Sequence, residues 1–190
     1  MRDPGVPELS DRPDLPGMRV LPTADLGPDG LTALRALLDT AFDVYDDTSF
    51  DHALGGVHVL AGPVTAPVGH AAVVLRRVLH RGTALRCGYV ESVAVCPSHR
   101  GRGLGGALMS VIGRLVRGGY EVGALGADER AASLYRRHGW CPWRGPLRAL
   151  TPDGVVDTPK ESGAVHVLDA GMRLDARHAL TCDWRDGELW

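Results

Sequence analysis

The sequence predicts one α+β domain whose central sheet is mixed, mostly antiparallel and flanked by helices. Three observations favour this class. Runs rich in β-branched residues and broken by Gly and Pro cover residues 57–61, 68–80 and 84–95, a pattern typical of an antiparallel meander. An amphipathic helical pattern follows, with apolar residues at i, i+4, i+8 and i+11 from Leu104. The length of 190 residues also fits one ordinary domain.

Apolar spacing and composition also predict the elements that precede residue 57. A short strand is expected to begin near Met18, and helical spacing of apolar residues predicts a helix over residues 32–42. Residues 43–51 hold four aspartates and no cation, and we expect a loop or weak helix over a cleft. The Pro- and Asp-rich residues 1–17 are expected to form a mobile tail.

The segments after the meander complete the fold. The amphipathic helix is expected to end at the two glycines 118 and 119, before a strand over residues 120–125. Asp128 is expected to cap a helix that continues to Arg137 and stops at Gly139. Residues 144–190 are expected to be β-rich, with strands at 166–169 and 172–175. Neither a repeat nor a long linker interrupts residues 18–190, which we treat as one domain.

Composition excludes several classes of protein. Hydrophobic residues make up 44% of the chain and the net charge is −2, which argues against disorder and against nucleic-acid binding by bulk electrostatics. No apolar run reaches membrane-spanning length, and residues 1–17 lack the apolar core of a signal peptide. The four cysteines form no C-x-x-C pair, so no metal site is expected. We expect a cytoplasmic protein with reduced thiols.

A glycine-rich turn between the meander and the helix is the most informative segment. Residues 96–106 read CPSHRGRGLGG. Such a turn directs backbone N–H groups at one point, and the helix N-terminus adds positive potential there. Glycine permits an anion to approach the backbone closely, and Arg100 and Arg102 add cations. This chemistry suits a pyrophosphate.

Other interpretations of the turn are weaker. Gly101-x-Gly103-x-x-Gly106 satisfies a dinucleotide-binding pattern, but that pattern belongs directly after a strand of a parallel βαβ unit. A P-loop is excluded because no Lys-Ser or Lys-Thr follows the glycines. A turn without a ligand remains as the third alternative.

Two motifs together carry a family resemblance. Arg100-x-x-Gly103-x-Gly105 resembles the acyl-coenzyme A pyrophosphate loop of the GCN5-related N-acetyltransferase (GNAT) superfamily, and residues 131–140, AASLYRRHGW, resemble its A-x-x-L-Y-x-x-x-G-F/W signature. GGVHVL, ALRCGYVESVAV, RGRGLGGALM, LYRRHGW and CDWRDGELW further resemble the aminoglycoside 2'-N-acetyltransferases over residues 18–190. The resemblance implies the GNAT fold, acetyl-CoA as co-substrate, direct transfer in a ternary complex, and a homodimer.

Glu91 is the candidate base. By strand alternation it interrupts an apolar face that holds Leu85, Cys87, Tyr89, Val93 and Val95. Apolar surroundings would raise its pKa toward that of a useful base, whereas a salt bridge to an arginine or a β-bulge would give it a structural role. The resemblance implies that Glu91 acts as general base through a water.

The resemblance also implies the remaining catalytic and coenzyme contacts. Tyr135 is placed beside the coenzyme sulfur as the acid, although helix periodicity alone favours core packing. The strand is expected to bulge near Glu91–Ala94. Coenzyme contacts are then expected from Val93, Ala94, Val95, Arg100, Gly101, Arg102, Gly103, Leu104 and Gly105. Cys87 and Cys96 lack a motif histidine and are expected to be structural.

Two acidic clusters predict a polycationic acceptor. The first comprises Asp39, Asp43, Asp46, Asp47 and Asp51, in a stretch without Lys or Arg, and the second comprises Asp183, Asp186, Glu188 and the end of the chain at Trp190. A solvated surface is the alternative. Together with the resemblance, this predicts substrate contacts from Asp43 or Asp46, Glu91, Ser92, Gly126, Glu161, Glu188 and Trp190.

Two rival functions stay open. One keeps the fold and coenzyme but acetylates another polyamine, a cell-wall amino sugar or a protein N-terminus. The other is a non-catalytic coenzyme A-binding module.

Overall fold

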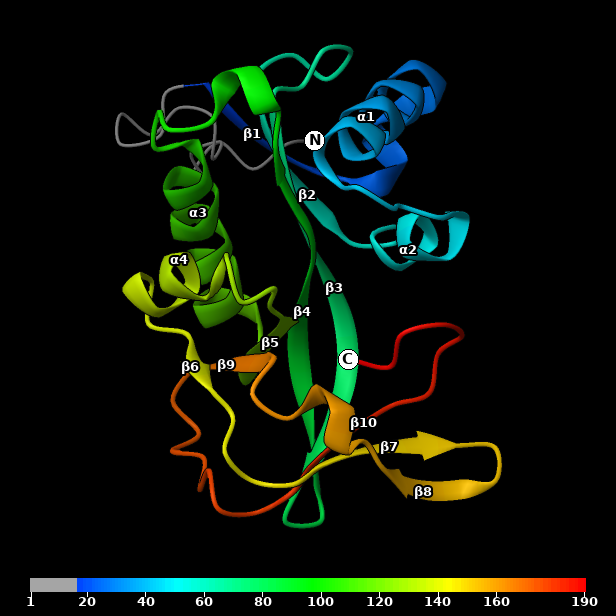
Figure 1. The fold of residues 1–190 in the computed structure, drawn as a ribbon, viewed down its shortest axis with the longest axis vertical. Coiled ribbons are helices and arrows are strands. Elements are labelled where there is room, and N and C mark those ends of the chain that lie inside the picture. Colours follow the sequence, from blue (N-terminus) through cyan, green and yellow to red (C-terminus); the bar gives the residue numbers. More distant parts are fainter. Residues whose placement is uncertain (1–16) are drawn as a thin grey trace, which may run out of the picture.

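The computed structural model describes residues 17–190, and within them one mixed sheet of ten strands forms the centre of the molecule (Figure 1). The strands are β1 (Met18–Pro22), β2 (Val57–Ala61), β3 (Gly69–His80), β4 (Thr83–Val95), β5 (Val122–Gly126), β6 (Cys141–Pro142), β7 (Leu147–Thr151), β8 (Gly154–Asp157), β9 (Val165–Asp169) and β10 (Leu180–Cys182). The helices are α1 (Gly27–Ala41), α2 (Asp47–His52), α3 (Leu104–Gly119) and α4 (Ala132–Arg137). The predicted α+β class is confirmed. The expected tail lies, apart from Gly17, outside the described residues.

The order of strands is β6-β9-β5-β4-β3-β10-β7-β8, with β2 and then β1 added beside β3. The antiparallel pairs β2–β3 and β3–β4 form the predicted meander. Arg81 and Gly82, both with positive φ, make the turn between β3 and β4. The predicted strand bounds in the meander are correct to within one residue.

Strand β4 has different neighbours along its length. It pairs with β3 along its length but runs parallel to β5 only from Cys87 to Tyr89. Beyond Tyr89, β4 and β5 separate. In the same region Glu91 pairs with Ala72 and Ala94 with His70, so two residues of β4 face one residue of β3. This is a β-bulge, as the sequence predicts, and Ser92 within it has φ of +52°.

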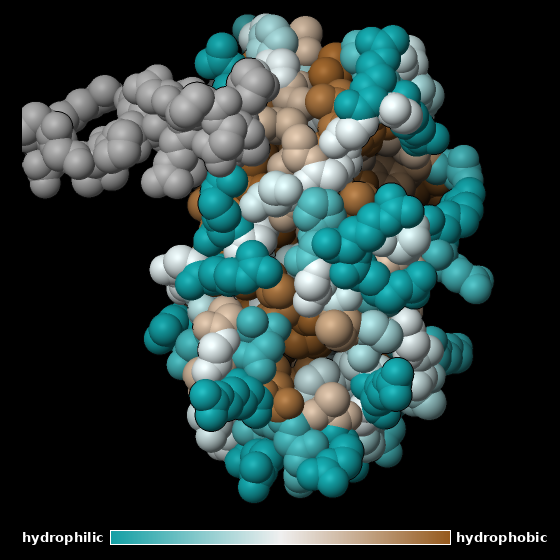
Figure 2. Space-filling view, turned by 90° about the vertical axis from the view of Figure 1, so that its left-hand side faces the viewer, coloured by the Kyte–Doolittle hydropathy of each residue, from teal (hydrophilic) through white to brown (hydrophobic). Residues whose placement is uncertain are grey.

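Helices cover both faces of the sheet (Figure 1). Leu108, Ile112 and Val116 of α3 are fully buried in a cluster with β-strand residues and Trp140. On the opposite face, Leu34 and Leu38 of α1 pack against β2 and β4. Figure 2 shows one side of the molecule, where hydrophobic residues appear between larger hydrophilic areas. No helix within residues 17–190 combines the length and hydropathy needed to cross a bilayer.

Several predicted elements need correction. Helix α1 begins at Gly27 because Pro28 occupies its first turn. Helix α4 begins at Ala132, and the Asp128 carboxylate instead accepts the Arg130 N–H in a preceding turn. The strand expected at 172–175 is a loop, since the Asp169 carboxylate accepts the backbone N–H groups of Gly171, Met172 and Leu174. The short strands β7, β8 and β10 were not predicted individually.

Candidate active site

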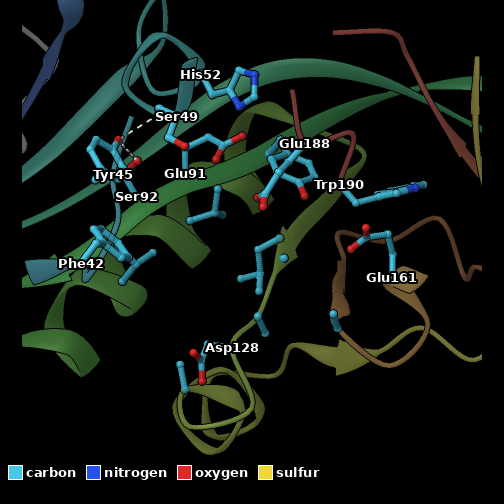
Figure 3. A pocket seen from close by; sticks show the side chains of 18 of the residues that line it. Phe42, Tyr45, Ser49, His52, Glu91, Ser92, Asp128, Glu161, Glu188 and Trp190 are labelled. Carbon is cyan, nitrogen blue, oxygen red and sulfur yellow. Dashed lines mark hydrogen bonds between the residues drawn. The ribbon is translucent and has the colours of Figure 1, made fainter. Parts of the chain in front are cut away.

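A cavity of about 430 Å³ lies where β4 and β5 separate (Figure 3). One wall is the bulged part of β4, and the facing wall is the end of β5 with the turn that leads to α4. The segment around α2, the segment with Glu161 and Ala164, and the C-terminal segment 183–190 complete the walls. Residues from five distant parts of the chain therefore meet at one site because the sheet opens at this point.

Glu91 lies in this cavity with its side chain only 14% exposed. Its carboxylate accepts a short hydrogen bond from the guanidinium of Arg185. Burial raises the pKa of Glu91, and the neighbouring Arg185 opposes that rise. The salt bridge and the bulge that the sequence left open as alternatives are thus both present.

The bulge changes which residues share a face with Glu91. Leu85, Cys87 and Tyr89 belong to one core cluster, whereas Val93 and Val95 pack against the cluster on the α3 side. The prediction of one apolar face was therefore wrong beyond Glu91. The extra residue in the bulge reverses the alternation of the strand.

Two arginines fasten the C-terminal segment over the site. Arg76, 5% exposed, donates to the Asp183 carboxylate at 2.7 Å and to the Leu189 carbonyl at 2.6 Å. Arg185 also donates to the Glu188 carbonyl at 2.6 Å. Both guanidinium groups lie close to the Tyr89 ring, at 4.8 and 5.1 Å from its centroid. Asp183 is therefore occupied by a structural ion pair.

The α2 side of the cavity is fastened to the bulge. The Tyr45 hydroxyl donates to the Ser49 carbonyl at 3.0 Å and shares a 2.6 Å hydrogen bond with the Ser92 hydroxyl. Burial raises the pKa of Tyr45 to about 12. His52 of α2 contacts the Asp186 carbonyl at 2.8 Å. Two walls of the cavity are thus joined through side-chain hydrogen bonds that sequence spacing does not reveal.

Tyr135 lines the cavity on the α4 side and is 7% exposed. Burial raises its pKa to about 12, so the hydroxyl keeps its proton at neutral pH. Ala132 and Tyr135 are the buried residues of this short helix. Tyr135 therefore packs in the core and also lines the cavity, although the sequence treated a core position and a position at the site as alternatives.

Four carboxylates surround the cavity (Figure 3). Glu91, Glu161 and Glu188 were predicted from the sequence, and Asp128 was not, because it had been interpreted as a helix cap. Asp128 pairs with Arg130 at 3.0 Å on the exposed rim. Within residues 17–190, no salt bridge involves the side chain of Glu161 or Glu188.

The first acidic cluster does not line this cavity. Among the described lining residues, neither Asp43 nor Asp46 is present. Asp46 caps α2 by accepting the Ser49 N–H at 2.8 Å. Arg35 neutralises Asp39 and Asp47 at 2.8 and 2.6 Å. Arg35, one helical turn before Asp39, thus pairs with two of the five aspartates that the sequence assigned to a polycation site.

Gly126 and Trp190 meet in the cavity wall. A Cβ at Gly126 would lie 3.4 Å from the Trp190 main-chain oxygen. The Trp190 side chain is 4% exposed and its indole N–H donates to Thr158 at 3.1 Å. The Trp190 ring is therefore held by the protein, and its main-chain oxygen lies beside Gly126.

The glycine-rich turn lies at the N-terminus of α3. Gly101 and Gly103 have φ of +75° and +80°, and Gly103 begins the helix without a side-chain cap. Arg100 donates to the Val95 carbonyl at 3.1 Å and to the Ala41 carbonyl at 3.0 Å. Its guanidinium thus ties the turn to β4 and to the end of α1, while Arg102 is exposed.

Cys87 occupies a structural position in the core. Cys87 is fully buried, and burial raises its pKa to about 12. A thiol with this pKa is a poor nucleophile at neutral pH. This agrees with the structural role expected for Cys87.

Comparison with known proteins gives the family. A model of the acetyltransferase (GNAT) domain matches residues 56–142. The aminoglycoside 2'-N-acetyltransferase of Mycolicibacterium fortuitum is 44% identical over 177 residues, which cover 90% of this chain and 91% of that protein. The chain belongs to the aminoglycoside 2'-N-acetyltransferase family. The family and fold predicted from the sequence are confirmed.

More distant relatives of this aminoglycoside 2'-N-acetyltransferase family member share the domain. N-acetyltransferase Eis of Mycobacterium tuberculosis is 34% identical over 146 residues, covering 74% of this chain and 33% of that protein. The GNAT-family N-acetyltransferase YhbS of Escherichia coli, solved in complex with CoA, has a TM-score of 0.58 at 21% identity and covers 89% of each chain. At 21% identity, the similarity to YhbS shows a shared fold.

The Arg185–Glu91 pair generates a prediction about protonation. Arg185→Met keeps the aliphatic stem but removes the charge that lowers the pKa of Glu91. We expect the pKa of Glu91 to rise further, so that its carboxylate becomes protonated at a higher pH than in the parent protein. Carbon-13 NMR of the Glu91 carboxyl group during a pH titration measures this.

The matched control is Arg86→Met, which removes a surface arginine 3.9 Å from Glu121. It should leave the titration of Glu91 unchanged. An unchanged or lower pKa of Glu91 in Arg185→Met would show that the guanidinium does not govern this carboxylate.

Proposed function

We propose that the protein transfers the acetyl group of acetyl-CoA directly to the 2'-amino group of aminoglycosides in a ternary complex. The observation that carries this proposal is the cavity in which Glu91, Glu161, Glu188 and Asp128 surround one space. Aminoglycosides are polyammonium sugars, and carboxylates are strong partners for such cations. The 44% identity to the M. fortuitum aminoglycoside 2'-N-acetyltransferase supports the same acceptor.

Acetyl-CoA binding is proposed along β4 and the glycine-rich turn. The β4–β5 pairing ends at Tyr89, which supports backbone contacts from Val93, Ala94 and Val95 to the coenzyme. The amides after Gly101 and Gly103 and the charge of Arg102 suit the pyrophosphate. Arg100 is assigned mainly to holding the turn, since backbone carbonyls already occupy its guanidinium.

Glu91 and Tyr135 are proposed as the proton-transfer groups. Burial gives Glu91 a raised pKa, which suits a base that removes a proton from the acceptor ammonium through a water. The neutral Tyr135 hydroxyl can supply a proton to the departing coenzyme thiolate. The amine nitrogen then attacks the thioester carbonyl and the carbon–sulfur bond breaks. Glu91 holds the first proton taken from the ammonium, and the second N–H proton, lost as the amide forms, replaces the proton that Tyr135 gives to the thiolate.

Acceptor contacts are proposed from the cavity walls. Glu161, Glu188 and Asp128 supply charge, while Ser92 and the main chain at Gly126 and Trp190 supply polar groups. Asp43 and Asp46 lie outside the cavity lining and are retained only for parts of a large acceptor that extend beyond it. Residues 18–190 are proposed to act as one domain.

A homodimer and a cytoplasmic location belong to the same proposal. Leu75 of β3, Val155 of β8 and Trp184, two residues after β10, are exposed by 57%, 58% and 49%. They support a subunit contact. The four free cysteines support a reducing compartment.

An acceptor panel tests the proposed function. Purified protein with acetyl-CoA should acetylate aminoglycosides that carry a 2'-amino group, with regiochemistry assigned by NMR of the product. Aminoglycosides with a 2'-hydroxyl are the matched controls and should not be modified at that position. Turnover confined to linear polyamines, amino sugars or peptide N-termini would replace the acceptor, and coenzyme binding without any turnover would favour a binding module.

Replacement of the proposed base should remove most of the rate. Glu91→Gln keeps the shape but cannot accept the proton, so kcat should fall about 100-fold or more and recover little as pH rises. Glu121→Gln, a change at a carboxylate bonded to the Arg86 N–H, is the control and should retain activity. Steady-state kinetics across pH measure both. Near-parental kcat in Glu91→Gln would remove the assigned role.

Replacement of the proposed acid should affect chemistry more than binding. Tyr135→Phe keeps the buried ring and loses only the hydroxyl, so kcat should fall about 10- to 100-fold. The Kd for acetyl-CoA, measured by calorimetry, should stay within about threefold of the parent value. Loss of coenzyme binding with unchanged kcat would instead identify a packing residue.

A further inference from the structure

Two buried histidines, His58 of β2 and His70 of β3, form a series of hydrogen bonds that ends at the bulge of β4, and neither is among the residues that line the cavity. The His70 Nδ1 atom lies 2.8 Å from the Ser92 carbonyl oxygen, and its Nε2 atom lies 2.9 Å from His58 Nδ1. His58 Nε2 in turn lies 2.8 Å from the Thr23 hydroxyl. Both imidazoles are completely buried. These hydrogen bonds thus connect Thr23, near the start of the domain, to the bulge residue Ser92.

The acceptor at one end fixes every proton in the chain. A carbonyl oxygen only accepts, so His70 must carry its proton on Nδ1. A neutral His70 then has a lone pair on Nε2, and His58 must donate to it from Nδ1. This leaves a lone pair on His58 Nε2, which the Thr23 hydroxyl faces at 2.8 Å. The hydroxyl proton is donated to this nitrogen in preference to the Gly56 carbonyl, which lies farther away at 3.4 Å. Burial lowers the pKa of His58 to about 4 and that of His70 to about 3, so both are neutral at neutral pH.

The residue at the end of this chain is in an unfavourable conformation. Ser92 has φ of +52°, a left-handed conformation that is uncommon for residues other than glycine and persists only where neighbours hold it. His70 binds its carbonyl and Tyr45 binds its hydroxyl. The same bulge carries Glu91 and Val93, which line the cavity.

We propose that His70 is a positioning residue for acetyl transfer. It donates from Nδ1 to the Ser92 carbonyl, in a tautomer selected by His58 and Thr23. This hydrogen bond holds the bulge in the shape that places Glu91 and the adjoining backbone at the reacting atoms. His70 is fully buried and does not line the cavity, so its proposed role is exerted through the bulge. This inference rests on the proposed acetyl transfer, whereas the tautomer it requires is a property of the free protein.

Three variants test the role of the donor. His70→Ala removes it, and His70→Asn places an amide N–H near the position of Nδ1. His80→Ala is the matched control, because His80 is another buried histidine of β3 whose Nδ1 lies 3.3 Å from a backbone carbonyl, that of Ala179, far from the bulge. The acceptor is whichever amine the panel identifies.

The expected result separates positioning from stability. His70→Ala should lower kcat about 10- to 100-fold, since displacement of reacting groups by about 1 Å has effects of this size, and His70→Asn should recover most of that loss. His80→Ala should lower the Tm in the same direction but keep kcat within about threefold. Equal kcat in His70→Ala and His80→Ala, or no recovery in His70→Asn, would overturn the proposal.

Nitrogen-15 NMR of the unmodified protein tests the tautomer without any substrate. His70 should show a protonated Nδ1 and an unprotonated Nε2, and His58 should show the same pattern. A His70 protonated on Nε2 would overturn the proposal even if His70→Ala fails to fold. If no amine is acetylated, the proposed function fails. The NMR measurement still decides whether the hydrogen bonds from Thr23 through His58 and His70 to Ser92 exist in the predicted tautomer.

Discussion

The separation of β4 from β5 after Tyr89 is the constraint on which the site depends. Up to that residue the two strands satisfy each other's backbone groups, and beyond it the edge of β4 is released from β5. The opening gives room for the cavity and provides unpaired backbone polar groups that a ligand can satisfy. The bulge at Ser92 occurs in the same stretch and reverses the strand's alternation. Consequently Glu91 faces the opening, while Val93 and Val95 complete the core beneath α3.

The charges around this opening are arranged in two groups with different roles. Arg76 and Arg185 hold the C-terminal segment through the Asp183 carboxylate, three backbone carbonyls and Glu91, and both guanidinium groups lie near the Tyr89 ring. These pairs are largely buried, so they fix geometry, and removing one partner would leave a buried charge without compensation. The side chains of Glu161 and Glu188 have no such partner within the described chain and stay available to cations. A site for a polyammonium acceptor needs both: a rigid frame and uncompensated acid groups.

Side-chain hydrogen bonds hold the backbone at several places around the site. Arg100 joins the glycine-rich turn to β4 and α1, Tyr45 joins the α2 side to the bulge, and His70 holds the bulge from behind. Each contact is a hydrogen bond to, or beside, a main-chain atom whose position matters for a ligand. A site built this way can use backbone amides as binding groups, because the elements that carry them do not shift independently.

The sequence by itself determined the elements whose signals are local. The runs of β-branched residues within 57–95, the helical period that begins at Leu104 and the glycine-rich sequence of residues 101–106 are properties of short stretches. They predicted the meander, α3 and the turn between them. Only the tertiary structure decided the Arg185–Glu91 pair, the place of Asp128 in the cavity, the neutralisation of Asp39 and Asp47 by Arg35, and the histidine chain. Glu91 and Arg185 are 94 residues apart in sequence, and their contact follows from the order of strands in the sheet. Periodicity reports which face of an element is buried, but not which other element covers it.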